Sequence, residues 1–593
     1  MHGLLQLDRR SVDRAGQTTE DAGEERQPGG RRRRGGLPRS AWVAAAYAAM
    51  ALALTFRAWI DPQHQLIGTG SDPISGSWAI SWVPFAIGHG TNPLFSDYMN
   101  SPSGINLFWN NTDGIPLLVL WPVTALWGAF VTFNVAITGG LAASAFTAFL
   151  AIRRFVPGYV AAAVGGALYG FSPYMVGQVS HVDLILSGIS PPLALLLVHE
   201  LVVRQRLPIA AFSALTALLA LIQYFVWPEI LVTEVLAVLV LLVVLALLHR
   251  DLVRARLAYI TRGIAYSGAL TACALALPLL FQLAGPARVQ YITQGRGIFV
   301  TDALNFIVPT SAQVLAPSAA TAVSSRFTGD VAEWGGYLGI PLLLVIVYTL
   351  IRYRRVPLVR ALAAFAFVLA VLSLGPTLHI DGRNTGIPMP WTLFNNITLV
   401  DDVLPARLMT YVFLALGVGL AFVLSRIWGE RRHVTAGVLV AAAALVPLLP
   451  KVPVATEAPS VPAFFTGTAV TALPEGSVAL VLPWAEGAFA TPLAWQAEAG
   501  MRFRMPDGYF VGSTDPDADR LHTELETLWS AVTRGNAVST GDRGRLLSLM
   551  GELRIAEVIV GPGSGQPGYA ALMHQVLGAP WLRYGPVEVW RTS

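Results

Sequence analysis

Apolar runs of about twenty residues recur along this chain, and they constrain its fold more than any other feature of the sequence. A helical run of that length spans the hydrocarbon core of a bilayer. The composition agrees, because 54% of the 593 residues are hydrophobic and 13% are Asp, Glu, Lys or Arg, against about 25% charged residues in soluble domains. The sequence therefore predicts a polytopic α-helical membrane protein.

Arginine supplies almost all of the positive charge, since Lys451 is the only lysine and the formal net charge is +4. This balance gives no support to a nucleic-acid partner. Cys273 is the only cysteine, so the chain can form no internal disulfide and no cysteine-based metal site. Its place in an apolar run predicts a packing role.

The apolar runs predict about eleven transmembrane helices, at residues 41–60, 134–152, 158–176, 184–201, 208–226, 230–248, 262–284, 335–351, 357–375, 407–425 and 434–450. If the first span leads outward, the arginine clusters between later spans all fall on the cytoplasmic side. That orientation requires the stretch 115–131 to remain outside as a juxtamembrane helix, which Pro116 and Pro122 favour. Residues 1–40, with the run Arg31–Arg34, are then expected to form a disordered cytoplasmic tail.

Most of the remaining chain is predicted to lie outside the cytoplasm. A transmembrane domain at 41–450 would include a first outer loop at 61–133, and a proline-marked linker at Pro450–Pro453 would lead to a small extracytoplasmic α/β domain at 451–593. In that domain we expect strands at 477–482 and 556–560 and helices at 517–533 and 542–553. The glycine-rich stretch after the second strand is expected to be an ordinary strand-to-helix loop.

Asp72 stands soon after the first predicted span, in Gly70-Ser71-Asp72-Pro73. Its position before Pro73 and the helical-looking run 74–88 is typical of a helix N-cap. The same position also places a carboxylate at the lipid–water boundary, where chemistry on lipid-linked substrates takes place. The two interpretations are compatible, because a cap holds its side chain in a fixed place.

Other ionisable residues at the outer ends of spans are candidate site residues, because charge inside a bilayer is costly and usually retained for function. Arg407 suits a lipid phosphate through its planar fork, or it pairs with Asp401 or Asp402. Arg296, Arg288 and Arg383 are weaker candidates for binding phosphate. The residues that could support catalysis are Asp97, His181, Asp183, Glu229 and Glu333. Asp113 and Glu234 are further candidates. Each has a capping or interfacial alternative, yet together they predict an acidic and aromatic ring around one outward cavity.

These features resemble the GT-C membrane glycosyltransferases. The resemblance rests on the uncleaved first span, a long outer first loop with an early acid, a juxtamembrane helix and a C-terminal outer domain. It is strengthened by Pro102-Ser103-Gly104, Ser172-Pro173-Tyr174 and Pro405-Ala406-Arg407. It covers roughly residues 41–450 and depends more on architecture than on one diagnostic motif.

The resemblance implies a bacterial plasma-membrane enzyme with a cytoplasmic N-terminus that moves a sugar from a polyprenyl-phosphate donor to a glycan, lipid or protein acceptor on the outer face. Asp72 would be the catalytic base of an inverting transfer, with Arg407 on the departing phosphate. Many members carry two neighbouring acids where this chain has Asp72-Pro73. Some members also hold a divalent cation, so the resemblance allows a divalent cation as a cofactor of this chain. No spacing in the sequence indicates a metal site.

Two other functions remain open. A transporter or flippase of lipid-linked saccharides would carry ionisable groups near the middle of several spans, and Glu234 is the main such residue here. A non-catalytic GT-C-like protein could instead organise envelope assembly. Loss of glycan transfer on Asp72→Asn distinguishes an enzyme from both.

Overall fold

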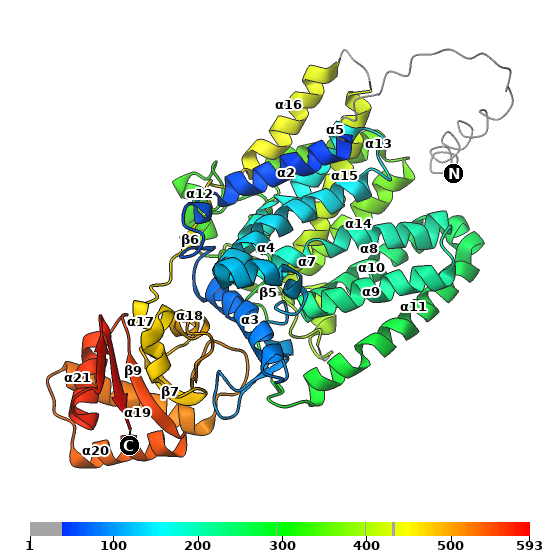
Figure 1. Ribbon diagram of the computed structural model, residues 1–593. Helices are drawn as coiled ribbons and strands as arrows, with labels where there is room; N and C mark the ends of the chain where they lie inside the picture. The colour runs from blue at the N-terminus through cyan, green and yellow to red at the C-terminus, as the bar shows by residue number, and fades with distance from the viewer. Residues whose placement is uncertain (1–37, 292, 398, 430–432, 593) are drawn as a thin grey trace, which may run out of the picture. The chain divides into compact units, whose positions relative to one another are not determined.

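The computed structural model describes residues 38–291, 293–397, 399–429 and 433–592 (Figure 1). The chain divides into two compact units, Met1–Trp42 and Val43–Ser593, and the second is described below. Almost all of the predicted N-terminal tail lies outside the described residues.

Helices occupy each predicted membrane span. They are α2 (Arg39–Thr55), α4 (Trp121–Ile152), α5 (Tyr159–Gly170), α6 (Pro173–Gly177), α7 (Val182–Ser187), α8 (Ser190–His199), α9 (Ile209–Val226), α10 (Pro228–Leu248), α11 (Arg250–Ala284), α13 (Ile340–Tyr353), α14 (Pro357–Ser373), α15 (Met409–Ile427) and α16 (Val434–Leu445). Within the described residues, seven helical segments are long and apolar enough to cross a membrane, and three shorter apolar helices accompany them. The chain is thus a multi-pass helical protein, and eleven as the number of spans stays a prediction.

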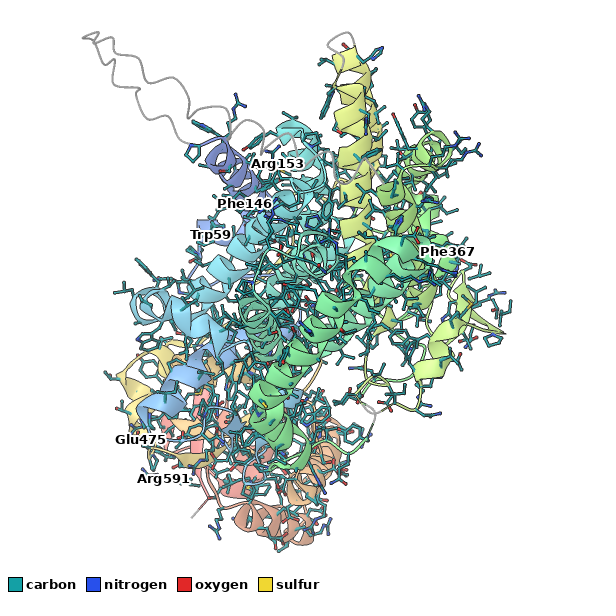
Figure 2. The ribbon with its side chains drawn as sticks, turned by 90° about the vertical axis from the view of Figure 1, so that its right-hand side faces the viewer. Trp59, Phe146, Arg153, Phe367, Glu475 and Arg591 are labelled. Atoms are coloured by element: carbon teal, nitrogen blue, oxygen red, sulfur yellow. The ribbon has the colours of Figure 1, made fainter. Side chains whose placement is uncertain are left out.

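Apolar side chains cover the outside of the helical bundle, as a lipid solvent allows. Phe367 on α14 is 70% exposed and projects from the bundle in Figure 2. Cys273 on α11 is also exposed, so its predicted packing role is wrong. The same helix begins at Arg250, twelve residues before the predicted span at 262, because the arginine cluster continues the helix.

The predicted juxtamembrane stretch 115–131 is continuous with the span that follows it. A short 3₁₀ turn at Pro116–Leu120 leads into α4, which changes direction at Gly128, where φ is 87° and ψ is 171°. Leu126 and Trp127 are 68% and 53% exposed. The glycine therefore joins an exposed amphipathic segment to a buried helix, because its left-handed φ breaks the helical path. The interfacial position of this segment stays a prediction.

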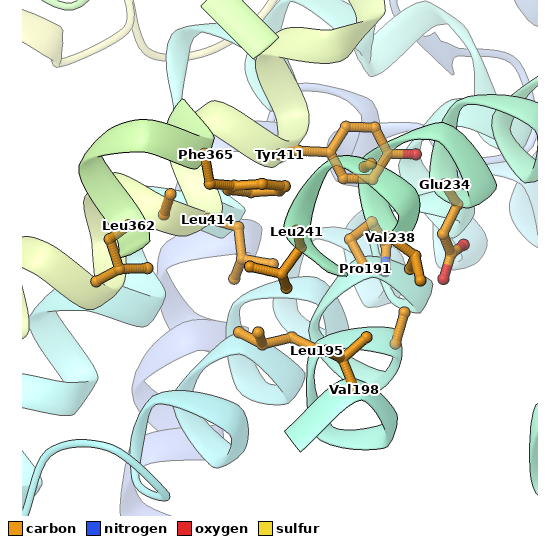
Figure 3. Close-up of a pocket in the computed structure, with 13 residues that line it drawn as sticks. Pro191, Leu195, Val198, Glu234, Val238, Leu241, Leu362, Phe365, Tyr411 and Leu414 are labelled. Atoms are coloured by element: carbon orange, nitrogen blue, oxygen red, sulfur yellow. The ribbon is translucent and has the colours of Figure 1, made fainter. Parts of the chain in front are cut away.

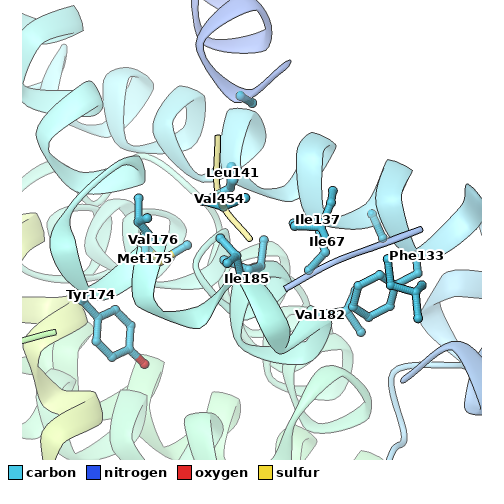
Figure 4. Close-up of a cluster of buried hydrophobic side chains, with 14 of the residues drawn as sticks. Ile67, Phe133, Ile137, Leu141, Tyr174, Met175, Val176, Val182, Ile185 and Val454 are labelled. Carbon is cyan, nitrogen blue, oxygen red and sulfur yellow. The ribbon is translucent and has the colours of Figure 1, made fainter. Parts of the chain in front are cut away.

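The centre of the bundle is α15, which is buried along nearly its whole length. It packs on α5 through two glycines: a Cβ on Gly165 would lie 2.3 Å from the carbonyl oxygen of Gly417. Such close backbone contact between membrane helices requires small residues. Beside it, α4 and α7 contribute Phe133 and Ile185 to the same large apolar cluster, which also includes Ile67 (Figure 4).

A five-stranded mixed sheet forms the C-terminal α/β domain, in the order β10-β11-β9-β7-β8. Its strands are β7 (Ser477–Leu482), β8 (Phe503–Arg504), β9 (Ile555–Val560), β10 (Leu582–Tyr584) and β11 (Val587–Arg591), and its helices are α17 (Ala463–Thr466), α18 (Thr491–Glu498), α19 (Pro516–Thr533), α20 (Thr540–Glu552) and α21 (Gln566–Leu577). The first strand, β7, runs parallel to both β8 and β9. The two predicted strands and two predicted helices are confirmed, and the glycine-rich stretch is the loop between β9 and α21.

The predicted first outer loop folds against this domain. The loop contains β1 (Leu66–Ile67), α3 (Ser71–Gly88), β2 (Phe95–Ser96) and β3 (Ile105–Asn106), and β1 pairs antiparallel with β6 (Thr456–Glu457) of the linker. The indole of Trp78 on α3 donates to Gln496 on α18 at 2.6 Å. The remaining short elements are α12 (Ser318–Ser324), β4 (Thr377–Ile380) and β5 (Arg383–Pro388). Residues more than 400 positions apart therefore share one interface.

Candidate functional site

Asp72 lies in the first turn of α3, and its side chain contacts two distant parts of the chain. Gly70, with φ of 87°, occupies the N-cap position, so the predicted N-cap role of Asp72 is wrong. One carboxylate oxygen of Asp72 lies 3.3 Å from His181 Nε2, and the other accepts a hydrogen bond of 2.9 Å from the Tyr509 hydroxyl. A carboxylate in a first helical turn is also favoured by the helix dipole.

A close backbone approach holds His181 beside Asp72. His181 has an extended backbone between a 3₁₀ turn at Gln178–Ser180 and α7. Gly68, with φ of 91°, fits so tightly that a Cβ there would lie 2.5 Å from Ser180 Oγ. The amide of Thr69 then donates to Ser180 Oγ at 3.2 Å. The segments before Asp72 and before His181 are thus fixed together, because only glycine fits at this contact.

The two side chains form an ion pair at neutral pH. Burial works to raise the pKa of Asp72, but the hydrogen bond and positive charge of His181, helped by Tyr509 and Arg407, hold it below its ordinary value. Burial works to lower the pKa of His181, yet Asp72 raises it to about 9. Burial and the Asp72 charge raise the pKa of Tyr509, so its hydroxyl keeps the proton that it donates. His181 Nδ1 is buried without a hydrogen-bond partner.

The positive charge of Arg407 lowers the pKa of both Asp72 and His181. The guanidinium group of Arg407 is itself held by two acids. Its Nη1 contacts Glu229, and its Nε donates to Glu333 at 3.0 Å. One guanidinium thus lies between two carboxyl groups in a buried cluster. The alternative partners considered above, Asp401 and Asp402, are wrong, because Glu229 and Glu333 pair with Arg407 instead.

Glu229 and Glu333 are themselves positioned by further contacts. Glu229 accepts hydrogen bonds from the backbone N–H of Leu404 at 2.8 Å and from the indole of Trp227 at 3.0 Å. One oxygen of Glu333 is buried and has no hydrogen-bond partner. A buried carboxylate oxygen without a donor is costly unless a ligand or water completes it. The role of Arg407 in binding a lipid phosphate stays a prediction.

Asp183 and Asp113 extend the buried polar region. Asp183, in the first turn of α7, is 6% exposed, and Asp113 is fully buried. Neither oxygen of Asp113 has a hydrogen-bond partner. Burial and the neighbouring Asp183 raise the pKa of Asp113 well above its ordinary value. Burial thus favours the neutral form of the Asp113 carboxyl.

Other sequence candidates make different contacts. Asp97 pairs with Arg504 of the C-terminal domain at 3.2 Å. Arg296 reaches Asn396 at 3.5 Å and lines a cavity of about 20 Å³ with Asp401 and Asp402. The roles assigned to Asp97 and Arg296 stay predictions.

Glu234 is buried inside the bundle, where Ser190 donates to it at 2.7 Å. It borders an apolar cavity of about 40 Å³ together with Tyr411 and Phe365 (Figure 3). The cavity is small and its walls are hydrophobic. Glu234 thus has a neutral donor within reach and an apolar surrounding.

Tyr509 is the residue of this site that the sequence did not indicate. It lies 437 positions from Asp72, in a loop between β8 and α19. Its motif, Pro506-Asp507-Gly508-Tyr509, signals only a turn. A contact across that distance has no local sequence signal.

The acids present do not fit a metal centre. Among the residues that the structure describes, no group of three or more His, Cys, Asp or Glu side chains could hold a metal ion. His181 is further committed to Asp72, and a protonated imidazole cannot ligate a metal.

Comparisons with known proteins place this arrangement in context. Residues 41–449 match the family model described as "Domain of unknown function (DUF6311)". No curated protein matches the sequence.

Solved membrane glycosyltransferases share the fold. The arabinofuranosyltransferase AftD from Mycobacteria is 15% identical with a TM-score of 0.55, and the alignment covers 94% of this chain and 40% of that one. The Archaeoglobus fulgidus oligosaccharyltransferase, in complex with Zn and sulfate, is 12% identical with a TM-score of 0.50, over 87% of this chain and 67% of that one. This chain thus spans less than half the length of AftD. The likeness shows that it has the GT-C glycosyltransferase fold.

Proposed function

We propose that this chain, which belongs to the DUF6311 family, is an integral-membrane glycosyltransferase that moves a sugar from a polyprenyl-phosphate donor to an envelope acceptor. The GT-C fold supports glycosyl transfer in general. The observation that carries the proposal is the half-buried Asp72 carboxylate, held between His181 and Tyr509 in the first turn of α3. Such a carboxylate is ionised and fixed in place, as a general base must be.

In the proposed reaction, an acceptor hydroxyl attacks the anomeric carbon from the face opposite the lipid phosphate. A new C–O bond to the acceptor forms while the C–O bond to phosphate breaks, so the anomeric centre inverts. Asp72 accepts the hydroxyl proton, and the phosphate leaves with the bonding electron pair. The pKa of Asp72 lies below its ordinary value, so the carboxylate is ionised at neutral pH.

Positive charge near Asp72 would stabilise the departing phosphate. His181 is protonated at neutral pH, and its Nδ1 is buried and unpaired, so it offers a charged N–H donor. Arg407 supplies a second positive charge, but its fork already contacts Glu229 and Glu333. In the proposed site His181 contributes positive charge, and its buried Nδ1 would donate once a phosphate reaches it, while Arg407 would bind phosphate only by exchanging a carboxylate partner.

The location and partners of the protein follow the same proposal. The N-terminus would be cytoplasmic, and the first loop and the C-terminal domain would face the outside of a bacterial plasma membrane. The arginine clusters between spans support this orientation. The donor would be a polyprenyl-phosphate-linked sugar, and the acceptor a glycan, lipid or protein of the envelope.

The test is Asp72→Asn, which keeps the size of the side chain and removes the base. We expect transfer to fall about 10²- to 10⁴-fold, the usual contribution of a general base. Envelope glycans and accumulated lipid-linked sugars are compared at equal protein level in the membrane. Asp61→Asn is the matched control, because Asp61 is an exposed acid of the same loop paired with exposed His64. Undiminished transfer by Asp72→Asn would favour a transporter or an assembly protein.

A further inference from the structure

A hollow of about 180 Å³ lies in the C-terminal domain at the carboxyl ends of β7 and β8. Its walls include Trp484 and Glu486 after β7, Asp507 and Phe510 after β8, and Asp519 and His522 on α19. Ligands of α/β sheets bind at the carboxyl ends of parallel strands. The volume is below the 300–1,000 Å³ of pockets for drug-sized molecules, so the hollow suits one small polar unit.

The carboxyl group of Asp507, in the wall of the hollow, has one oxygen without a hydrogen-bond partner. Asp507 is 2% exposed, and one of its oxygens accepts a hydrogen bond of 2.8 Å from the backbone N–H of Ala485. The other oxygen is buried and has no partner. Burial raises the pKa of Asp507 to about 7, so this carboxyl both donates and accepts near neutral pH. A hydroxyl-bearing ligand satisfies such a group.

Aromatic rings line the same hollow. The ring of Trp484 stacks on His522 with centroids 4.6 Å apart and an angle of 6° between the planes. Phe510 adds a second apolar surface. A few polar groups among aromatic walls match the two sides of a sugar ring, which has apolar C–H faces and hydroxyl edges. Glu486 and Asp519 supply further acceptors for hydroxyls, and their negative charge disfavours an acidic ligand.

The hollow adjoins Asp72 through two loops. Tyr509, which binds Asp72, lies between the lining residues Gly508 and Phe510. Gly487, next to lining residue Glu486, accepts a hydrogen bond of 2.8 Å from the hydroxyl of Ser71. The loops that form the hollow are therefore the loops that touch the start of α3.

We propose that this hollow is an acceptor subsite that holds one neutral sugar unit of a glycan acceptor beside the Asp72 carboxylate. This inference rests on the proposed glycosyltransferase function, and it selects a glycan from the glycan, lipid and protein acceptors considered above. The subsite binds the acceptor independently of the donor lipid. It positions the acceptor and takes no part in the chemical step.

The experiment measures glycan binding by the full-length protein in lipid nanodiscs, with no donor present. The probes are neutral trisaccharides of arabinofuranose, mannose, glucose and galactose, and an acceptor-length peptide serves as the competing class. Saturation-transfer NMR and calorimetry report binding. We expect at least one trisaccharide to bind and the peptide not to bind.

Two substitutions test whether binding occurs in the hollow. Asp507→Asn removes the unpaired acceptor, and Phe510→Leu removes an aromatic face while keeping an apolar side chain; each is expected to weaken trisaccharide binding at least tenfold. Asp542→Asn is the control, because Asp542 is an acid on α20 that pairs with Arg545 away from the hollow. Thermal unfolding midpoints confirm that each variant is folded.

The possible results separate the subsite from the enzyme function. No trisaccharide binding, binding of the peptide alone, or equal trisaccharide affinity in the folded Asp507→Asn and Phe510→Leu proteins would overturn the subsite. If Asp72→Asn leaves transfer intact while Asp507→Asn weakens glycan binding, the proposed enzyme function fails and the hollow stands as a glycan-binding site without an acceptor role.

Discussion

Replacing His181 with Gln tests the Asp72–His181 ion pair without any knowledge of the substrate. Glutamine can still donate a hydrogen bond to Asp72, but it carries no charge at any pH. The pKa of His181 is about 9 in the folded protein instead of its ordinary 6.5. That difference corresponds to about 3 kcal/mol of interaction favouring the charged imidazole.

The sign of the pH dependence follows from the raised pKa. The stabilisation from His181 is fully present below about pH 6.5 and is lost as the pH rises through about 9. At pH 7 most of this stabilisation, about 2–3 kcal/mol, remains, and at pH 9 less than about 1 kcal/mol remains. Dividing the free energy lost between pH 7 and 9 by the unfolding entropy of a chain of this size gives a fall in unfolding temperature of about 1–2 °C.

The assay is thermal unfolding of the purified protein at pH 6 to 10, with each variant compared with the wild type at the same pH. We expect His181→Gln to be less stable than the wild type at pH 7 and nearly equal to it above pH 9. His64→Gln is the control, because His64 is exposed and pairs with exposed Asp61. Parallel wild-type and His181→Gln curves from pH 7 to 9 would refute the ion pair.

Three further predictions concern the contacts around this site. Tyr509→Phe removes a hydrogen bond to a charged group, worth about 1.5–3 kcal/mol, and should slow glycan transfer about tenfold, whereas Tyr569→Phe, which removes a tyrosine–glutamate bond elsewhere in the C-terminal domain, should not. Arg407→Gln leaves two buried carboxylates without their cation and should lower the free energy of unfolding by about 3–5 kcal/mol, measured by denaturant titration; a loss below about 1 kcal/mol would contradict the cluster. Gly68→Ala should lower the unfolding temperature more than Gly70→Ala, because both glycines have positive φ but only a Cβ at Gly68 would meet close atoms. Equal decreases in unfolding temperature would show that the close approach at Gly68 does not contribute to stability.

Most helices and strands could be predicted from the local sequence. Apolar length predicted helices at each span, and short apolar runs bounded by turn residues predicted β7, β9, α19 and α20. These features depend on hydrogen bonds and side-chain periods that span only a few residues, so they are encoded locally. Residue type and place along the chain were also enough to select Asp72 and Arg407 as candidates.

Tertiary structure alone decided which groups meet. Arg407 is paired with acids 178 and 74 positions away, and Asp72 with a tyrosine 437 positions away. The predicted pairing of Arg407 failed because it considered only neighbouring acids. The predicted N-cap at Asp72 failed for a local reason, because α3 begins at Ser71 and Gly70 takes the cap position. The interaction energy of a buried charge depends on the groups that surround it in space, because few water molecules remain to screen the interaction. No local pattern carries that information.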